Sequence, residues 1–313
     1  MLLPVSAVIP TRNRPGPLER TLASLAEQSA QPHEIVVIDA SDGPETARLC
    51  CRPFAALRSS VMYLPARTRG AAAQRNEGIR AASQDVIGFM DDDVILEPGC
   101  LDRLWQALAA DAALGGVNAL IVNQQYLPPS RLTCRLYTLL HGRALASYAG
   151  RCIGPAVNLL PGDRPDIPEV VPVDWLNLGC TLYRREALPE PVFDPFFTGY
   201  SMFEDLALSL VVGRKWKLAS VRTARLFHDS QPSDEKNRVG AMATMELINR
   251  HYVMTTVLGR HDLAHYMKLI LFESYLLAAA LKTRRGRRRF FTLLRGKCRA
   301  LAQILGWRMR DNS

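Results

Sequence analysis

The sequence lacks the spacing patterns that mark several large functional classes. No Gly-x-Gly-x-x-Gly turn follows the first apolar run and no Gly-Lys-Ser/Thr phosphate loop occurs, which disfavours nicotinamide chemistry and P-loop phosphoryl transfer. A Gly-x-Ser-x-Gly nucleophile elbow is also missing. The seven cysteines form no paired Cys-x-x-Cys spacing, so a zinc ribbon is not indicated. Their odd number is typical of free thiols in a reducing compartment.

A leader and a long apolar run are lacking as well. The N-terminus passes straight into a strand pattern, so we expect no secretory signal. Residues 263–281 are apolar but contain His265, Lys268 and Glu273, and they fall short of a convincing transmembrane span. At about 100° per residue these three polar side chains occupy one arc, which predicts an amphipathic helix.

Positive charge is concentrated at the end of the chain. The formal charge is +9, but from Lys282 onward eleven Lys or Arg stand against one acid, which leaves −1 for residues 1–281. Apolar side chains, among them Trp307, are interspersed with this basic charge at helical spacing. That composition favours a helix lying on an anionic membrane surface over a nucleic-acid arm. The alternative is a helix packed on the body with solvated arginines.

Short apolar runs alternate with helical patterns over the first third of the chain. We expect strands at 5–9, 34–39, 60–64 and 85–90, helices at 17–28, about 44–52, 70–82 and 98–110, and, further on, a strand near 178–183, a helix near 204–213 and helices from 240 to the end. The alternation predicts an α/β fold with a mostly parallel sheet and flanking helices, followed by a helical C-terminal extension.

The middle of the chain reads differently. Residues 124–172 contain seven prolines and are interpreted as a loop-rich insertion rather than a second sheet. The predicted organisation is a first half over 1–115, a second half of the same domain over 116–235, and a basic, membrane-associating tail over 236–313.

Polar groups follow three of the expected strands: Thr11 to Arg14, Asp39, and Asp91–Asp93. Ligands of such sheets bind beyond the carboxyl ends of the strands, so we expect these groups to share one crevice. Three adjacent carboxylates repel one another without a cation, and oxygen ligands suit Mg²⁺ or Mn²⁺. A solvated acidic turn is the alternative.

Three further candidates have ordinary explanations beside functional ones. Glu204 and Asp205 open a helical pattern, where acids are also favoured by the helix dipole. His228 follows an apolar run, and a lone histidine is more often structural. Arg75, which follows Arg67 and Arg69, could face a diphosphate or simply be solvated.

The order of these pieces resembles a known family. The stretches VSAVIPTRNRPGPLERTLASLAEQ, EIVVIDASDG and RGAAAQRNEGIRAASQDVIGFMDDDVILEPG look like the nucleotide-binding half of family-2 inverting glycosyltransferases, which have the glycosyltransferase-A fold. WLNLGCTLYRREAL, FDPFFTGYSMFEDLALSLVVGRKWKLA and LFHD are similar to their acceptor half. The resemblance covers roughly residues 5–230.

The resemblance implies roles for individual residues. On the donor side, Pro10, Thr11 and Arg12 match the loop that touches the nucleotide, Asp39 matches the acid that binds the base, and Arg75 matches the arginine of an Ala-Arg-Asn element near the nucleotide. Where family members often have two acids, this chain has only Asp39.

The acidic motifs are matched too. Asp91 and Asp93 correspond to the outer positions of the family's Asp-x-Asp motif. Its last acid usually ligates the metal, while the others, here Asp91 and Asp92, approach ribose and phosphates. His228 matches a histidine sometimes found at the metal. The implied metal ligands are Asp93, Asp91 and His228, with Mn²⁺ or Mg²⁺ as cofactor.

Asp205 matches the catalytic base of the family's Glu-Asp motif, with Glu204 beside it. The implied activity is metal-dependent, inverting transfer from a nucleoside diphosphate sugar to a hydroxyl of a saccharide or lipid-linked acceptor. We expect a role in cell-surface polysaccharide or glycolipid synthesis at the inner face of the cell membrane. A Gln-x-x-Arg-Trp signature is missing, so processive polymerisation is not expected. A nucleotidyltransferase and a non-catalytic membrane-docked module are the alternatives.

Overall fold

The computed structural model describes residues 1–124, 126–231 and 237–311, with side chains described up to residue 306 in the last helix. The side chain of Trp307, expected on an apolar face of the tail, is outside that set. The chain forms two compact units. Unit 1 comprises Met1–Leu127, Ala149–Arg151 and Leu159–Gln231, and unit 2 comprises Pro128–Tyr148, Cys152–Asn158 and Pro232–Ser313.

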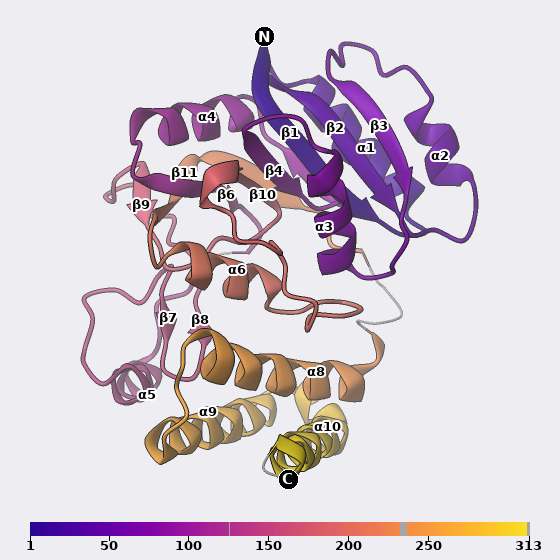
Figure 1. Ribbon diagram of the computed structural model, residues 1–313. Helices are drawn as coiled ribbons and strands as arrows, with labels where there is room; N and C mark the ends of the chain where they lie inside the picture. The colour runs from indigo at the N-terminus through magenta and orange to yellow at the C-terminus, as the bar shows by residue number, and fades with distance from the viewer. Residues whose placement is uncertain (125, 232–236, 312–313) are drawn as a thin grey trace. The chain divides into compact units, whose positions relative to one another are not determined.

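Unit 1 is built on one mixed sheet (Figure 1). Its strands are β1 (Leu2–Thr11), β2 (Gln31–Asp39), β3 (Ser60–Pro65), β4 (Val86–Met90), β5 (Val94–Leu96), β6 (Leu114–Ile121), β9 (Val170–Pro172), β10 (Cys180–Arg184) and β11 (Lys217–His228). They are ordered β3-β2-β1-β4-β10-β6-β11-β5, with β9 on β11. Neighbours from β3 to β4 are parallel, as are β6 and β11, whereas β10, β5 and β9 run antiparallel to their partners.

Helices cover both faces of this sheet. They are α1 (Pro15–Ala26), α2 (Glu45–Cys50), α3 (Ala71–Ala81), α4 (Cys100–Ala110) and α6 (Glu204–Val212), and a single 3₁₀ turn, η1 (Arg185–Ala187), follows β10. The leucines of α1 and α4 pack with alternate residues of β1, such as Val5 and Ile9, in the main core. On the other face α3 approaches the sheet closely: a Cβ on Gly78 would lie 2.4 Å from the Ile38 side chain and 2.6 Å from that of Val8.

The expected α/β fold with a mostly parallel sheet and helical C-terminal segment is confirmed. Four strands of the same sheet, β5, β6, β9 and β11, were not predicted. β6 is buried along its whole length, and a short apolar run that is buried on both faces shows no alternation to identify it.

Residues 124–172 are rich in loops, but the expectation that they form no second sheet is wrong. The segment contains α5 (Arg131–His141), β9, and a two-stranded sheet of β7 (Cys152–Ile153) and β8 (Val157–Asn158). Local signals define α5: Ser130 caps its start by accepting from the Thr133 N–H, and Gly142 ends it with φ of 91°. The prolines lie outside the helix and do not interrupt it.

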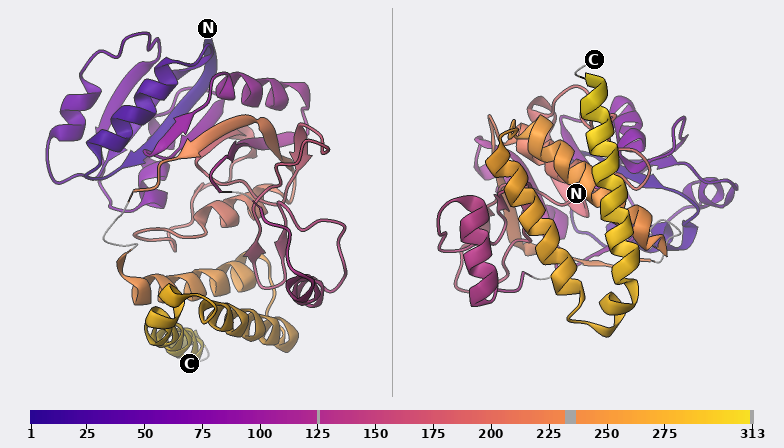
Figure 2. Two further views of the ribbon diagram at one scale, coloured as in Figure 1. Left: turned by 180° about the vertical axis from the view of Figure 1, so that it is seen from behind. Right: turned by 90° about the horizontal axis from the view of Figure 1, so that it is seen from below.

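Unit 2 is helical apart from the β7–β8 pair. Besides α5 it contains α8 (Val239–Tyr252), the π-helical turn η2 (Val253–Val257), α9 (Leu263–Ala280) and α10 (Arg284–Asp311). The right-hand view of Figure 2 shows α9 between α5 and α10. Gly296 of α10 packs closely on α8: a Cβ on Gly296 would lie 2.5 Å from the Gly240 carbonyl oxygen. Within the described residues, none of the helices combines the length and apolarity needed to span a bilayer.

The interior of unit 2 contains a buried ion network. Lys297 of α10 contacts Glu246 of α8 at 2.9 Å and Glu273 of α9 at 2.6 Å, and Arg250 of α8 contacts the same two carboxylates at 3.1 Å each. The network joins all three helices. Opposite charges lower the pKa of Glu246, although burial alone would raise it.

Replacing Lys297 by Met is expected to destabilise the protein by about 1.5–3 kcal/mol, since it removes the Lys297 ion pairs while Arg250 still contacts both Glu273 and the partly exposed Glu246. The measurement is the free energy of unfolding from urea titration followed by circular dichroism. Arg299→Met, on the exposed side of the same helix, should change it by less than about 0.5 kcal/mol. Equal effects of the two substitutions would contradict a structural role for the network.

Candidate active site

The carboxyl ends of three parallel strands carry the predicted acids in unit 1. Thr11 and Asp39 are register partners at the ends of β1 and β2, and Asp91 directly follows β4. The Thr11 hydroxyl donates to Asp92 at 2.7 Å, which ties the first strand end to the acid cluster. The predicted strand-end groups therefore lie at the same edge of the sheet.

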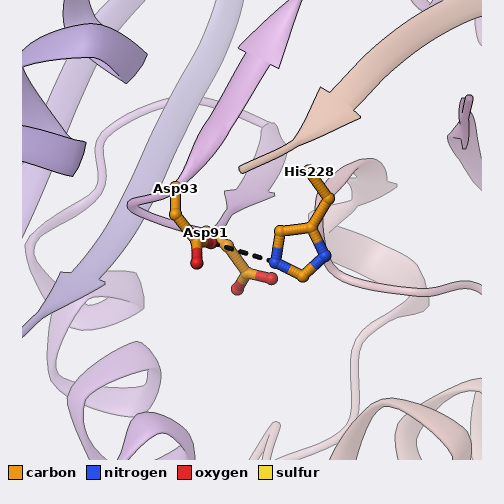
Figure 3. Close-up of side chains that lie close together, drawn as sticks. All are labelled: Asp91, Asp93 and His228. Atoms are coloured by element: carbon orange, nitrogen blue, oxygen red, sulfur yellow. Dashed lines mark hydrogen bonds and ion pairs between the residues drawn. The ribbon is translucent and has the colours of Figure 1, made fainter. Parts of the chain in front are cut away.

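Asp91, Asp93 and His228 could hold a metal ion (Figure 3). One ligand atom from each lies within 4.8 Å of the other two. β11 brings the histidine there because His228 pairs with Val94, the residue after Asp93. Two carboxylates and an imidazole are suitable donors for Mn²⁺ or Mg²⁺, with further positions left for substrate oxygens.

Gln124 sets the proton position on the His228 ring. Its amide nitrogen donates to Nδ1 at 2.8 Å, so the ring proton is at Nε2, which faces Asp93 at 3.1 Å. For Nε2 to ligate a cation, the proton has to move to Nδ1 and the Gln124 amide has to turn so that its oxygen accepts it. Gln124 is therefore a positioning residue for His228.

Arg14, which the sequence reasoning did not select, supplies a cation to the acid cluster. Its guanidinium contacts Asp92 at 2.7 Å and Asp93 at 2.5 Å. Two of the three carboxylates thus share a positive partner from the loop after β1. The only sequence signal for this role was its place after a strand end.

The neighbouring acids Asp92 and Asp93 differ in acidity. Burial raises the pKa of Asp92 to about 7, against the opposing effect of Arg14 and the Thr11 hydroxyl. Burial would also raise the pKa of Asp93, but the hydrogen bond from His228 and the charge of Arg14 lower it to about 2. Asp93 is accordingly the carboxylate that stays ionised and available to a cation.

Because Arg14 and a divalent ion compete for Asp93, replacing Arg14 by Gln is expected to tighten binding of Mn²⁺ alone. One charge-assisted contact corresponds to about 1.5–3 kcal/mol at most, so roughly tenfold is expected. Isothermal calorimetry without nucleotide measures this. Arg12→Gln, in the same loop but exposed, is the control. Unchanged or weaker affinity in Arg14→Gln would contradict the competition.

Arg75 connects the two acidic motifs. It is 3% exposed and contacts Asp91 at 2.7 Å and Glu204 at 2.8 Å. The Phe193 ring packs against the guanidinium with 5.7 Å from its centroid to Cζ. Arg75 was predicted to bind nucleotide, and that role remains a prediction; the structure places it as a buried brace between the strand-end acids and α6.

The Glu-Asp pair begins α6. The preceding residue, Phe203, has φ of 73°, a left-handed conformation that is strained for an aromatic residue and is typical of functional sites. Burial raises the pKa of Asp205 to about 6, although the Leu206 N–H and Arg75 favour its ionised form. Burial raises the pKa of Glu204 further, and the charge of Asp205 adds to the effect of burial. The pair is thus suited to exchanging protons near neutral pH.

The remaining predicted donor-site residues lie on the β1–β2 side. Asp39 is buried and accepts hydrogen bonds from the Ser41 backbone and hydroxyl and from the Tyr63 hydroxyl. Pro10 is buried at the end of β1, whereas Arg12 is exposed beyond it.

Tyr200 is an additional aromatic group at this site that sequence reasoning missed. It is 37% exposed, and burial raises its pKa to about 12 with further contributions from Asp91 and Glu204. The loop that contains Tyr200 lies close to Gly70: a Cβ on Gly70 would be only 3.2 Å from the Gly199 nitrogen.

Comparison with known proteins identifies the class. Residues 6–150, just under half of the chain, match the model "Glycosyl transferase family 2". A validoxylamine A glucosyltransferase from Streptomyces hygroscopicus subsp. limoneus is 34% identical over 110 residues, which cover 34% of this chain and 24% of that protein. The chain thus spans about a quarter of that relative, and the activity of the whole protein is a matter of proposal.

Two solved structures share the fold. The Pyrobaculum calidifontis mannosyltransferase PcManGT, in complex with GDP-Man and Mn²⁺, has a TM-score of 0.57 at 16% identity and covers 95% of this chain and 86% of its own. S. aureus TarS, in complex with UDP-GlcNAc, has a TM-score of 0.53 at 14% identity, with coverages of 93% and 79%.

The chain is similar to glycosyltransferase family 2 over residues 6–150, as its sequence motifs predicted, and it shares the glycosyltransferase-A-like fold of these two solved structures.

Proposed function

We propose that the protein transfers a sugar from a nucleoside diphosphate sugar to a hydroxyl group, with a divalent cation and with inversion at the anomeric carbon. One observation carries the proposal: Arg75 contacts both Asp91 and Glu204, so the candidate metal ligands and the Glu-Asp pair belong to one site. The family match over residues 6–150 supports the same reaction class.

The donor is proposed to lie over the carboxyl ends of β1, β2 and β4. Pro10, Thr11, Arg12 and Asp39 line the nucleotide end, as the family resemblance implies. The relatives of known structure carry GDP-Man or UDP-GlcNAc, which supports a nucleoside diphosphate sugar for this chain without selecting the sugar. Arg14, released from Asp92 and Asp93, is suited to contact a phosphate oxygen.

The cation is proposed to be Mn²⁺ or Mg²⁺, held by Asp93, Asp91 and His228. It would supply positive charge to the diphosphate as it leaves. The donor set fits such an ion, because Asp93 is ionised and already pairs with one cation, the Arg14 guanidinium.

Asp205 is proposed as the general base. The acceptor hydroxyl oxygen attacks C1 from the face opposite the diphosphate, its proton passes to Asp205, and the C1–O electron pair leaves with the nucleoside diphosphate. This single displacement inverts the anomeric centre. A base whose pKa is raised to about 6 is largely ionised at pH 7 and yet binds a proton more strongly than an ordinary aspartate.

The acceptor is proposed to be a saccharide or lipid-linked hydroxyl compound, used in non-processive synthesis of a cell-surface polysaccharide or glycolipid. The location is proposed to be the inner face of the cell membrane, held by the basic, helical part of unit 2. Nucleic acid is not a proposed partner.

A ligand screen tests the proposal. Purified full chain is heated with Mn²⁺ and a panel of nucleoside diphosphates, their sugars and nucleoside triphosphates, since a bound ligand raises the melting temperature. Stabilisation by a nucleoside diphosphate sugar, with release of nucleoside diphosphate on adding acceptors, supports it. Stabilisation by a triphosphate alone, with pyrophosphate release, identifies a nucleotidyltransferase. Donor binding without turnover on any saccharide or lipid-linked acceptor indicates a non-catalytic module.

A further inference from the structure

Helix α9 of unit 2 carries a row of apolar side chains on its outside, in addition to those it buries. Leu263 is 77% exposed, Met267 58% and Ile270 54%. With Leu271 and Leu281 these residues are spaced so that they fall on one side of the helix, which we name the α9 stripe. The stripe has no cover among the described residues.

The acidic side chain of α9 faces the opposite way. Glu273 is 7% exposed and pairs with Lys297 and Arg250 inside the bundle, beside the buried Leu269 and Phe272. A helix at a water interface usually has charged side chains in solvent opposite its apolar core side, and α9 instead has the apolar stripe there. The polar arc expected from the sequence is present at Glu273, but it points inward.

The apolar surface continues onto α5. The Thr133 hydroxyl of α5 lies 3.0 Å from the Tyr275 hydroxyl of α9, so these helices are neighbours. Leu132 and Leu139 of α5 are 69% and 59% exposed. Figure 2, in its right-hand view, shows α5 and α9 side by side. Two neighbouring helices from distant parts of the sequence therefore both expose apolar side chains.

A basic cluster follows the stripe. Arg284, Arg285, Arg288 and Arg289, one turn apart in pairs at the start of α10, line a single open hollow of about 540 Å³. None of the four pairs with a carboxylate among the described residues, and the helix N-terminus adds positive potential. Such a cluster has the chemistry of a phosphate site.

We propose that unit 2 docks through this face on a membrane surface rich in anionic phospholipid. The α9 stripe and the α5 leucines enter the boundary between headgroups and acyl chains, and the four arginines hold lipid phosphates. The inference rests on the proposed membrane location and deepens it: α9 and α5 provide the apolar contact, while α10, whose inner side packs on α8, provides the arginines.

Charge and composition favour a membrane over other occupants. In a symmetric contact between two copies the same patch meets itself, which would bring two arginine clusters close together. A free phosphate could occupy the hollow but leaves the stripe in water. The exposed side chains of the stripe are aliphatic or Met and offer no rings on which nucleic-acid bases could stack.

Vesicle co-sedimentation of the full chain tests the proposal. The vesicles are phosphatidylcholine alone or mixed with phosphatidylglycerol. The stripe variant is Met267→Gln/Ile270→Gln, the arginine variant is Arg288→Gln/Arg289→Gln, and the matched charge control in unit 1 is Arg48→Gln/Arg52→Gln. All replaced side chains of the two test variants are exposed, so thermal melting should be unchanged.

We expect the parent to bind the anionic vesicles more strongly as salt is lowered. Each test variant should lose about tenfold or more in partition coefficient, and the control should lose less than about twofold. Equal losses in test and control variants, or equal binding of the parent to neutral vesicles, overturn the proposal. The proposal is also overturned if the parent is a dimer and the stripe variant is a monomer that still binds vesicles. In that case a second copy of the chain, and not a membrane, covers the α9 stripe.

Inorganic phosphate is the remaining competitor. If the arginine variant loses phosphate binding while vesicle binding is unchanged, the hollow serves a soluble anion and the proposal fails. Transfer of sugar to a soluble acceptor is measured in parallel with the same variants. Docking and catalysis can then fail separately, because none of the replaced residues belongs to the candidate active site.

Discussion

Replacing Asp205 by Asn is expected to lower sugar transfer by about 10²–10⁴-fold, the range that a general base contributes. Asparagine keeps the size of the side chain and can still accept the hydrogen bond from the Leu206 N–H, but it cannot take a proton. The substitution leaves unchanged the residues at the ends of β1 and β2 that are proposed to bind the nucleotide, so nucleotide affinity should hardly change. The measurement is turnover with saturating donor, beside nucleotide binding by calorimetry.

Glu204→Gln is the matched control. Its amide oxygen can still accept from Arg75, so the brace to Asp91 is kept while one charge is lost. We therefore expect a smaller loss than for Asp205→Asn. The parent should also gain activity as pH rises through about 6, since the base has to be ionised. Near-parental turnover of Asp205→Asn would mean that another group takes the proton.

Replacing Asp93 by Ala is expected to weaken metal-dependent nucleotide binding by about 100-fold or more, because losing a ligand costs at least as much as losing a group that orients one. Asp93 is the acid with the lowered pKa, and it also holds His228 and Arg14 in place. Calorimetry with Mn²⁺ and a nucleoside diphosphate measures the change without relying on turnover.

Glu27→Ala is the control for charge, since this exposed acid lies at the end of α1, outside the acid cluster. Its binding should match the parent. If Asp93→Ala bound Mn²⁺ and nucleotide as tightly as this control, the ligand assignment would be wrong, and Asp91 with His228 would be the next residues to replace.

The sequence by itself was enough to predict the strands β1 to β4 and the helices between them. Two apolar runs are followed by the carboxylates of Asp39 and Asp91, and this change from apolar to charged residues predicted where the strands end. A buried strand can carry a carboxylate at its end far more easily than in its middle. The order of the motifs added the family. In contrast β6 and β11, which carry no alternation strong enough to read, were recognised only in the structure.

Only the tertiary structure shows which charged side chains form ion pairs with one another. Arg14 and Arg75 look alike in the sequence, yet their partners differ. Arg14 neutralises Asp93, whereas Arg75 connects Asp91 to Glu204, which lies 129 positions after Arg75 in the chain. Such pairs depend on strand order and register, which local patterns do not encode.

The direction in which the polar side of α9 faces was also determined by the tertiary structure. Periodicity placed Glu273 on one side of a helix but could not say whether that side faced water or the ion pairs of α8 and α10. Helical spacing fixes which side chains share a face, while only the packing of neighbouring helices determines what that face meets.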